Sequence, residues 1–306
     1  FNFNFSFLYN YLNSIKIKNK YFVLYFVLLY MSENFLFLDG KSGEQVMGNK
    51  REILYCRVKA EEIIESGKTF IKVESNGVPN YTPKIYDDSG IEITIKGIWE
   101  QELRKATDGE DGNPNYIGEH EHVFYIPKKP SGENWRWNRR NELPLDAIGV
   151  AVNGCLMYNS FTAGRNTYAV ESEMFDSCCG HPDSNKQYHY HQHPLCATGN
   201  SALTNVPQSS VAEYINDLVK SQTVSPIVGY MFDGVPVTGP VSYNKNGEVR
   251  ILQPSYEYDE YAEGKGDLDY YNGISSPLVE GGESVYHYVS TLKSTNGLTV
   301  DLTEDN

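Results

Sequence analysis

The sequence predicts a mainly β protein: one large β-rich domain, sandwich- or barrel-like, with one or two short helices. Two patterns favour this class. From residue 52 onward, short apolar stretches rich in β-branched and aromatic residues are separated by Gly, Pro, Asn and Asp, as in strands joined by turns. Few segments show helical spacing, and no internal repeat of fixed period is evident. The expected strands cover residues 53–58, 69–74, 91–98, 122–126, 148–152, 188–193, 227–232, 248–252 and 284–291.

Two segments are candidates for helices. Residues 209–221 carry apolar side chains at the 3-, 4- and 7-residue spacing that places them on one helical face, namely Val211, Tyr214, Ile215 and Leu218. Residues 98–106 form a shorter candidate. The helical component is therefore expected to be minor beside the strands.

The chain is expected to divide into an N-terminal segment (1–30), a linker (31–51), the β domain (52–295) and a tail (296–306). The first 30 residues use only eight residue types and contain no acidic residue. Two interpretations of this segment stay open. It is either an untrimmed gene model or a secretory signal, because three lysines precede an apolar run at residues 21–31. The run is too short to span a membrane.

The composition limits the classes of partner. The 306 residues include 26 basic and 40 acidic side chains, for a net charge of −14. Nucleic acid is not an expected partner, because such a chain repels phosphates and shows no stripe of Lys and Arg. No membrane span is expected either, since no apolar run approaches the roughly 20 residues that a bilayer requires. Acidic loops at 108–112 and 259–269 lack the spacing of an EF-hand, so calcium is only a weak alternative to solvated loops there.

Five cysteines indicate a disulfide and an oxidising, extracellular compartment. Cys178 and Cys179 lie on one side of a histidine-rich segment, and Cys196 lies on the other. Either of the first two can pair with Cys196, and the spacing does not choose between them. Such a bridge would stabilise the fold by about 3 kcal/mol in the chain-entropy model. The sequon at Asn80 agrees with secretion.

Four of the seven histidines lie between residues 181 and 193. On a strand, His189, His191 and His193 would share one face, and the interleaved tyrosines Tyr188 and Tyr190 would lie on the other. Two histidines at positions i and i+2 point the same way and can bind one ion. Neutral imidazole nitrogens bind Zn or Cu at about 2.0–2.1 Å. The pattern therefore predicts a transition-metal site.

A further ligand has to come from elsewhere in the fold. His181 is the nearby candidate, and His287, in a Tyr-His-Tyr segment, is the distant one. The predicted ligands are thus His181, His189, His191 and His287. The alternative is that the imidazoles donate to backbone carbonyls in a tyrosine-lined core. Desolvating several imidazoles together is costly without a ligand or a task, which favours a metal or catalytic role. His120 and His122 form a second alternating pair, expected on an exposed edge.

An ordered series of motifs spans roughly residues 70–291 and covers residues 147–154, 175–178, 180–183, 188–191, 228–240, 268–269, 272–273 and 286–288. This series resembles the YHYH domain family, which is named after residues 188–191. This resemblance implies a secreted or surface protein, without a settled activity. The chain departs from the family pattern at Tyr81, where family members tend to have His, and at Ile274, where they tend to have Arg.

Three functions from different classes fit these observations. The preferred one is a secreted metal-binding β domain. The second is a metal-dependent hydrolase in which Asp233 or Asp176 is the catalytic base, although the chain has none of the common hydrolase motifs. The third is a structural protein of an extracellular matrix or biomineral that self-associates, favoured by the acidity, the 24 tyrosines and the departures at Tyr81 and Ile274.

Overall fold

All residues that can be described lie in one compact unit, Phe37–Asn306. The predicted domain limits stay predictions. The expected strand at 91–98, the expected helix at 98–106 and the acidic loop at 108–112 fall outside the described residues. The computed structural model describes residues 45–47, 53–84, 115–130, 144–164, 167–173, 175–200, 203, 208–254, 256–257, 260–261 and 266–291.

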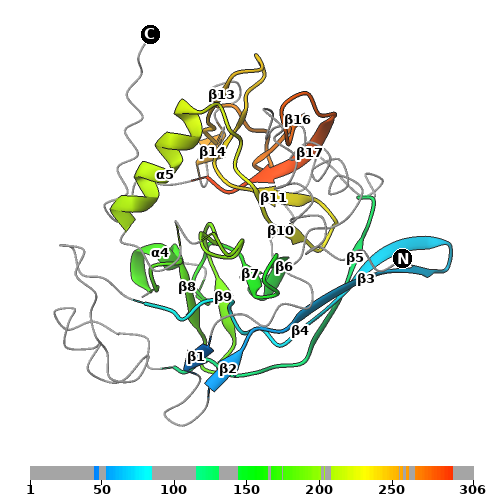
Figure 1. The fold of residues 1–306 in the computed structure, drawn as a ribbon, viewed down its shortest axis with the longest axis vertical. Coiled ribbons are helices and arrows are strands. Elements are labelled where there is room, and N and C mark those ends of the chain that lie inside the picture. The colour runs from blue at the N-terminus through cyan, green and yellow to red at the C-terminus, as the bar shows by residue number, and fades with distance from the viewer. Residues whose placement is uncertain are drawn as a thin grey trace, which may run out of the picture. The chain divides into compact units, whose positions relative to one another are not determined.

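An eight-stranded sheet forms the centre of this unit, in the order β16-β17-β11-β10-β6-β7-β9-β8 (Figure 1). The β-rich class is confirmed. Along the described strands the sheet is open, with β16 and β8 at its two edges, and it does not close into a barrel. Its strands are β6 (Ala147–Ala151), β7 (Leu156–Tyr158), β8 (Gly180–Pro182), β9 (Tyr188–Tyr190), β10 (Ile227–Met231), β11 (Pro236–Thr238), β16 (Gly273–Pro277) and β17 (Ser284–Val289).

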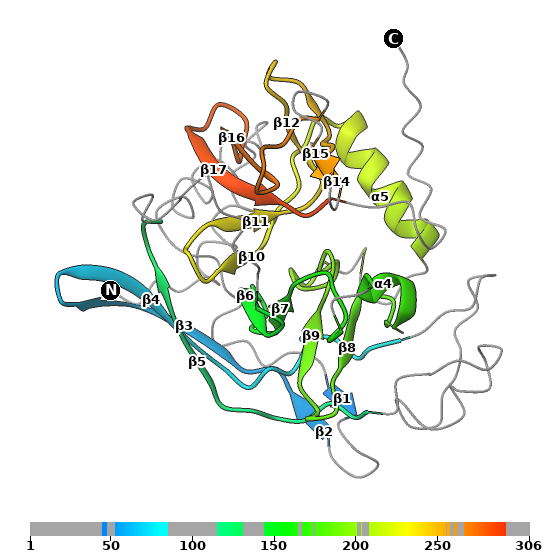
Figure 2. The ribbon, with the colours of Figure 1, turned by 180° about the vertical axis from the view of Figure 1, so that it is seen from behind.

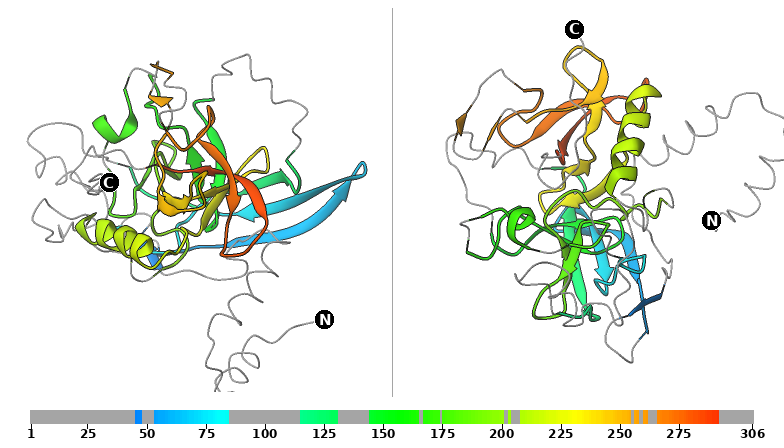
Figure 3. Two further views of the ribbon diagram at one scale, coloured as in Figure 1. Left: turned by 90° about the horizontal axis from the view of Figure 1, so that it is seen from above. Right: turned by 90° about the vertical axis from the view of Figure 1, so that its left-hand side faces the viewer.

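Smaller elements surround the main sheet. A three-stranded sheet consists of β3 (Val58–Glu65), β4 (Lys68–Ser75) and β5 (His122–Pro127). The turn end of the β3–β4 hairpin extends away from the other strands (Figure 2). The helices are α4 (Ala169–Ser172) and α5 (Gln208–Lys220), and α5 contacts β12 and β13 (Figure 3). Neither of these described helices is long and apolar enough to cross a membrane. The remaining strands pair in twos: β1 (Gln45–Met47) with β2 (Ile53–Tyr55), β12 (Val241–Tyr243) with β13 (Val249–Ile251), and β14 (Tyr256–Glu257) with β15 (Glu260–Tyr261).

Most of the predicted elements within the described residues are confirmed, but two strands are not continuous. The strand at 53–58 breaks after Tyr55, because the backbone N–H of Arg57 bonds the side chain of Asn76 rather than a strand. The strand at 188–193 stops at Tyr190. Beyond it the chain turns, and Pro194 cannot donate a ladder hydrogen bond. The confirmed elements are the strands at 69–74, 122–126, 148–152, 227–232, 248–252 and 284–291 and the helix at 209–221.

The main sheet consists of two halves with the same topology. Counted from either edge of the sheet, the strands of a half follow in the order third, fourth, second and first along the chain. We call β6, β7, β8 and β9 the first half, and β10, β11, β16 and β17 the second half. In both halves the first two strands pair as a hairpin, the second pairs in parallel with the fourth, and the fourth pairs antiparallel with the third. The register also repeats: Gly149↔Met157 in the first hairpin corresponds to Gly229↔Val237 in the second.

The two halves meet where β6 pairs antiparallel with β10, with Tyr230 opposite Val150. A Cβ added to Gly149 would lie 2.6 Å from the carbonyl oxygen of Tyr230. A Cβ added to Gly229 would lie 2.7 Å from the carbonyl oxygen of Val150. Both distances are too short for a side chain, so glycine at these matching positions allows the halves to approach closely.

The outer strands of each half are held by the same carboxylate contacts. Asp176 accepts hydrogen bonds from the backbone N–H groups two and four residues ahead and from the hydroxyl of Tyr188 on β9. Asp269 accepts the same set in the second half, ending on the hydroxyl of Tyr286 on β17 at 2.8 Å. These shared contacts align the halves residue by residue.

Candidate metal centre

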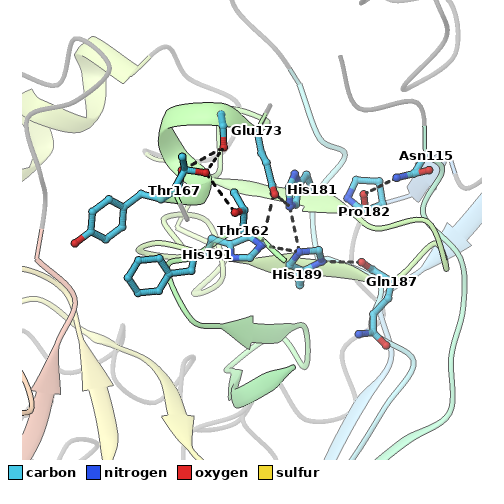
Figure 4. Close-up of polar contacts among 12 residues, drawn as sticks. Asn115, Thr162, Thr167, Glu173, His181, Pro182, Gln187, His189 and His191 are labelled. Atoms are coloured by element: carbon cyan, nitrogen blue, oxygen red, sulfur yellow. Dashed lines mark hydrogen bonds and ion pairs between the residues drawn. The ribbon is translucent and has the colours of Figure 1, made fainter. Parts of the chain in front are cut away.

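Three histidines converge on one point beside β8 and β9 (Figure 4). His181 on β8 lies directly opposite His189 on β9, so the antiparallel register places both side chains on the same face. His191 follows the end of β9 and points the same way. The Nε2 atom of His189 lies 3.1 Å from Nε2 of His181 and 3.0 Å from Nε2 of His191. We call these three residues the histidine triad.

Backbone carbonyls fix the protonation of two of these rings. His189 donates from Nδ1 to the carbonyl of Gln187 at 2.9 Å, and His191 donates from Nδ1 to the carbonyl of Asn159 at 2.6 Å. A carbonyl only accepts, so in each neutral ring the proton is on Nδ1 and Nε2 carries a lone pair. Two lone pairs therefore face each other at 3.0 Å. Imidazoles that ligate metals commonly show this carbonyl contact at the other nitrogen.

The triad is buried and its rings are packed against aromatic side chains. Its members are between 3% and 8% exposed. Tyr158 stacks on His189 with ring centroids 4.2 Å apart, and Phe175 stacks on His181 at 4.4 Å. Burial lowers the pKa of both His189 and His191 to about 4. Both rings are therefore neutral near pH 7, which is the state that binds a metal.

Glu173 lies at the more open side of the triad and follows α4 directly. Its Oε2 atom is 3.3 Å from Nε2 of His181 and 3.8 Å from Nε2 of His191 (Figure 4). The Glu173 side chain is 31% exposed, which is more than any member of the triad. Desolvation raises the pKa of this carboxyl group above its ordinary value.

The separations within the triad fit direct ligation of one ion. In a tetrahedral site with metal–nitrogen bonds of about 2.0–2.1 Å, neighbouring ligand atoms lie about 3.3 Å apart. The two short Nε2–Nε2 distances are close to this value, and all three nitrogens lie within 4.8 Å of one another. The nitrogen donors suit zinc and copper. The predicted ligands His181, His189 and His191 are thus brought together in an arrangement that can hold a metal ion.

His287 lies apart from this group. It sits on β17, which is separated from β9 by the four strands β11, β10, β6 and β7, or roughly 24 Å along the sheet. Its Nδ1 donates to the carbonyl of Val285 and its Nε2 faces Ser242 Oγ at 3.3 Å. His287 is the counterpart of His189 in the second half, because it occupies the same register in an equivalent strand. The sequence pattern selected it because both halves contain Tyr-His-Tyr.

The two predicted catalytic carboxylates have contacts of their own. Asp176 is fully buried and bonds Tyr188, whose side chain alternates to the face opposite His189. Asp233 forms the β10–β11 turn, where it accepts from the N–H of Val235 at 2.9 Å and from the hydroxyl of Tyr288 at 2.8 Å. Neither carboxylate contacts the triad among the residues that the structure describes, and the catalytic role predicted for them stays a prediction.

On the opposite face of β8 and β9 lies a second buried cluster, which we call the tyrosine network. The hydroxyl of Tyr81 is 2.8 Å from that of Tyr188 and 2.9 Å from that of Tyr190. Asn153 donates to Tyr190 at 2.9 Å, and Tyr188 donates to Asp176. Burial raises the pKa of all three phenols well above the ordinary value, so they stay protonated. The departure from the family pattern at Tyr81 is therefore an integral part of this core.

The other sequence candidates have structural partners. The disulfide joins Cys178 to Cys196, while Cys179 stays a buried free thiol. His193 bonds Ser290 Oγ through Nδ1 at 2.7 Å, away from the triad. The half-buried side-chain amide of Asn80, in the sequon, accepts a hydrogen bond from Asn153 at 2.9 Å.

Two further predictions concern the second histidine pair and calcium. The rings of His120 and His122 stack at 5.3 Å, and the Nε2 atom of each is buried without a hydrogen-bond partner. In the second acidic loop, Asp267 pairs with Arg250 at 2.6 Å, and Asp269 bonds the residues around it. The described carboxylates of this loop are thus engaged by protein groups.

Sequence reasoning missed four residues that shape the triad. Tyr158 and Phe175 stack on the imidazoles, and Asn159 orients His191 through its carbonyl. Glu173 faces two of the rings. Only Phe175 belongs to a motif that the family resemblance covers. Nothing in the spacing of Glu173 separates it from an ordinary solvated carboxylate.

Comparison with known proteins supports the family resemblance. The profile of the YHYH protein family matches residues 123–299, which is more than half of the chain. This region begins within β5, ends beyond β17 and includes the triad and both halves of the main sheet. No curated protein and no solved structure matches the chain. The chain therefore belongs to the YHYH protein family.

Proposed function

We propose that this chain is a metal-binding protein in which His181, His189 and His191 hold one zinc or copper ion. The observation that supports this function is the convergence of three buried imidazole nitrogens, two of which must present lone pairs to each other at 3.0 Å. Such an arrangement is repulsive unless a cation lies between the nitrogens. Burying several polar rings without a partner also costs free energy.

The surroundings of the triad support a site built for an ion. The two carbonyl contacts hold His189 and His191 in the tautomer that a metal needs, and the stacked rings of Tyr158 and Phe175 restrict the orientation of the imidazoles. Little rearrangement is therefore required on binding. Preorganised ligands lose less conformational entropy, which favours a tight site.

We further propose that the protein acts outside the cell. The disulfide between Cys178 and Cys196 brackets β8 and β9, so it supports the strands that carry the triad. Structural disulfides persist in oxidising compartments. The family resemblance to secreted and surface proteins points the same way.

Elemental analysis of the purified full-length chain tests the metal site. After exposure to Zn(II) or Cu(II) and gel filtration, the wild type should retain one ion per chain and the His189→Ala variant should retain almost none. His287→Ala is the matched control, because it removes the equivalent histidine from the second half and should retain the ion. Circular dichroism verifies that each variant is folded. If His189→Ala does not fold, His191→Gln replaces it in the test, because residue 191 lies outside the strands. A wild type without stoichiometric metal, or a folded triad variant that keeps it, would overturn the proposal.

A further inference from the structure

We infer that Glu173 is a fourth ligand of the metal and closes its coordination sphere with an oxygen. This inference rests on the proposed metal site and adds a residue that the histidine pattern does not contain. It follows from the geometry of the four side chains, from the charge that they bury together and from the way the chain holds Glu173 in place.

The four polar atoms form a closed ring. His189 faces His181 at 3.1 Å and His191 at 3.0 Å, and Glu173 faces the same two residues at 3.3 Å and 3.8 Å. Each side of this ring is near the separation of about 3.3 Å expected between neighbouring ligands of one ion. The Glu173 oxygen thus stands at the corner opposite His189, where a three-histidine site would otherwise be open.

Among the described residues, no Lys or Arg balances the charge of Glu173. Within the described parts of the chain, it forms no ion pair with Lys or Arg, and its only ionic contacts are the two histidines. Because His191 donates from Nδ1 to the carbonyl of Asn159, the neutral ring turns the lone pair of Nε2 toward the carboxylate. A divalent cation bound by the four groups would remove this repulsion and balance the carboxylate charge.

The segment that carries Glu173 is fixed to the same site. The N–H of Ala169, at the start of α4, bonds the carbonyl of Ser160 at 2.9 Å, and the N–H of Glu173 bonds the carbonyl of Ala169 at 2.8 Å. Asn159, the neighbour of Ser160, supplies the carbonyl that orients His191. The same short segment therefore orients the ring of His191 and holds the carboxylate of Glu173 in place. Glu173 is also more exposed than the three histidines, so it forms the solvent-facing side of the site.

Spectroscopy of the metal-loaded full-length protein tests the inference. The probes are Co(II), whose visible absorption reports the number of ligands, and azide, a small anion that occupies open positions. In the wild type we expect a spectrum that azide does not change. Glu173→Ala should keep cobalt with a changed spectrum, bind it about 10-fold more weakly or worse, and respond to azide. Glu173→Gln keeps the shape of the side chain and should also weaken binding.

Glu213→Gln on α5 is the control, because this glutamate is exposed and, among the described contacts, forms no hydrogen bond or ion pair with the triad or Glu173. It should match the wild type in affinity, spectrum and azide response. If Glu173→Ala and Glu173→Gln both match the wild type, Glu173 is not a ligand, while the histidine site stands. If the wild type binds no Co(II), Zn(II) or Cu(II), both proposals fail. If azide changes the wild-type spectrum as strongly as that of Glu173→Ala, the sphere is open and the inference is overturned.

Discussion

The first and second halves of the main sheet place different side chains on the same framework. Where the first half has His181 and His191, the second half has Ile274 and Val289, and only the central histidine is common to both. The neighbouring Phe175, which precedes Asp176, corresponds to Leu268, which precedes Asp269. In the second half these counterparts pack with Leu252 into an apolar cluster: Leu252, Leu268, Ile274 and Val289.

This difference separates what the framework supplies from what the site requires. Burying each aliphatic side chain of the second half stabilises the fold by about 1.5–3 kcal/mol. Burying imidazoles at the same positions brings no such gain, because desolvation opposes it unless a proton or metal partner is present. His287 is accommodated alone, with Ser242 near its Nε2 atom. The framework therefore positions one histidine, and the two flanking positions decide whether an ion can bind.

The largest effect is expected from giving the first half the residues of the second. The double variant His181→Ile and His191→Val leaves one histidine of the triad. Its affinity for Zn(II) should fall by about 100-fold or more, because losing only a residue that hydrogen-bonds a ligand already costs about 10- to 100-fold. The metal-free protein should be no less stable than the wild type, because two buried polar rings are replaced by apolar groups. Titration against a chromophoric chelator and urea unfolding in chelator measure the two quantities. Stoichiometric zinc in the variant would show that the triad is not the site.

The reverse exchange should build a second site. Ile274→His and Val289→His place three imidazoles around the position of His287, so a saturated protein should contain two ions in place of one. The metal-free variant should lose about 2–5 kcal/mol of stability, because buried aliphatic side chains are replaced by polar rings. Added Zn(II) should restore part of it. If the double variant does not fold, Val289→His alone still pairs with His287 and should bind Cu(II) weakly. A folded variant with unchanged metal content would contradict the equivalence of the halves.

Asp176 should make stability depend on pH. Burial raises the pKa of this carboxyl group to about 7, from 3.8. Between these values the folded state holds a proton at Asp176 that the unfolded state has released, so the contribution of this group to stability is full below about pH 4 and is lost as pH rises through about 7. The decrease should be on the order of a few kcal/mol. The buried histidines, with a pKa of about 4, change stability in the opposite direction as pH falls. Urea unfolding of metal-free wild type and Asp176→Asn at pH 5 and pH 8 isolates this contribution, because the histidines are common to both proteins. Relative to the variant, the wild type should lose stability from pH 5 to pH 8. An equal change of stability with pH in the two proteins would contradict the assignment to Asp176.

The same comparison explains which parts could be predicted from sequence. Strands with long alternating patterns, such as β4 and β17, were predicted, as was the shared face of His189 and His191. Strands of three residues, such as β7 and β8, are too short to show a period, and the Glu-rich β3 breaks the apolar alternation. The spacing of residues along the chain therefore predicts long strands and ligands that are close in sequence. Short central strands cannot be predicted in this way, because they form through pairing with distant parts of the chain.

The repeat of the two halves was hidden because the inserted segments differ in length. Asp176 precedes its tyrosine, Tyr188, by fewer residues than Asp269 precedes Tyr286. A search for a fixed period therefore fails, although every strand pairing is retained. His287 was assigned to the metal for the same reason: the motif around it is repeated, but the strand that carries it is not adjacent to β9. Contacts across the fold, which sequence spacing does not reveal, also bring Glu173 to the triad.

The smallest expected effect is a loss of stability when tyrosine hydroxyls are removed from the face of the sheet opposite His189 and His287. Tyr81→Phe removes the hydroxyl that lies between Tyr188 and Tyr190 in a fully buried network, so the loss should be about 1–3 kcal/mol. Tyr288→Phe removes a hydroxyl whose partner, Asp233, is exposed and can bond water instead, so the loss should be about 1 kcal/mol or less. Urea unfolding of the two variants in chelator gives both values under one condition. Equal losses of stability would mean that the buried hydroxyl of Tyr81 contributes no more than the hydroxyl of Tyr288, and that burial of the tyrosine network does not strengthen its hydrogen bonds.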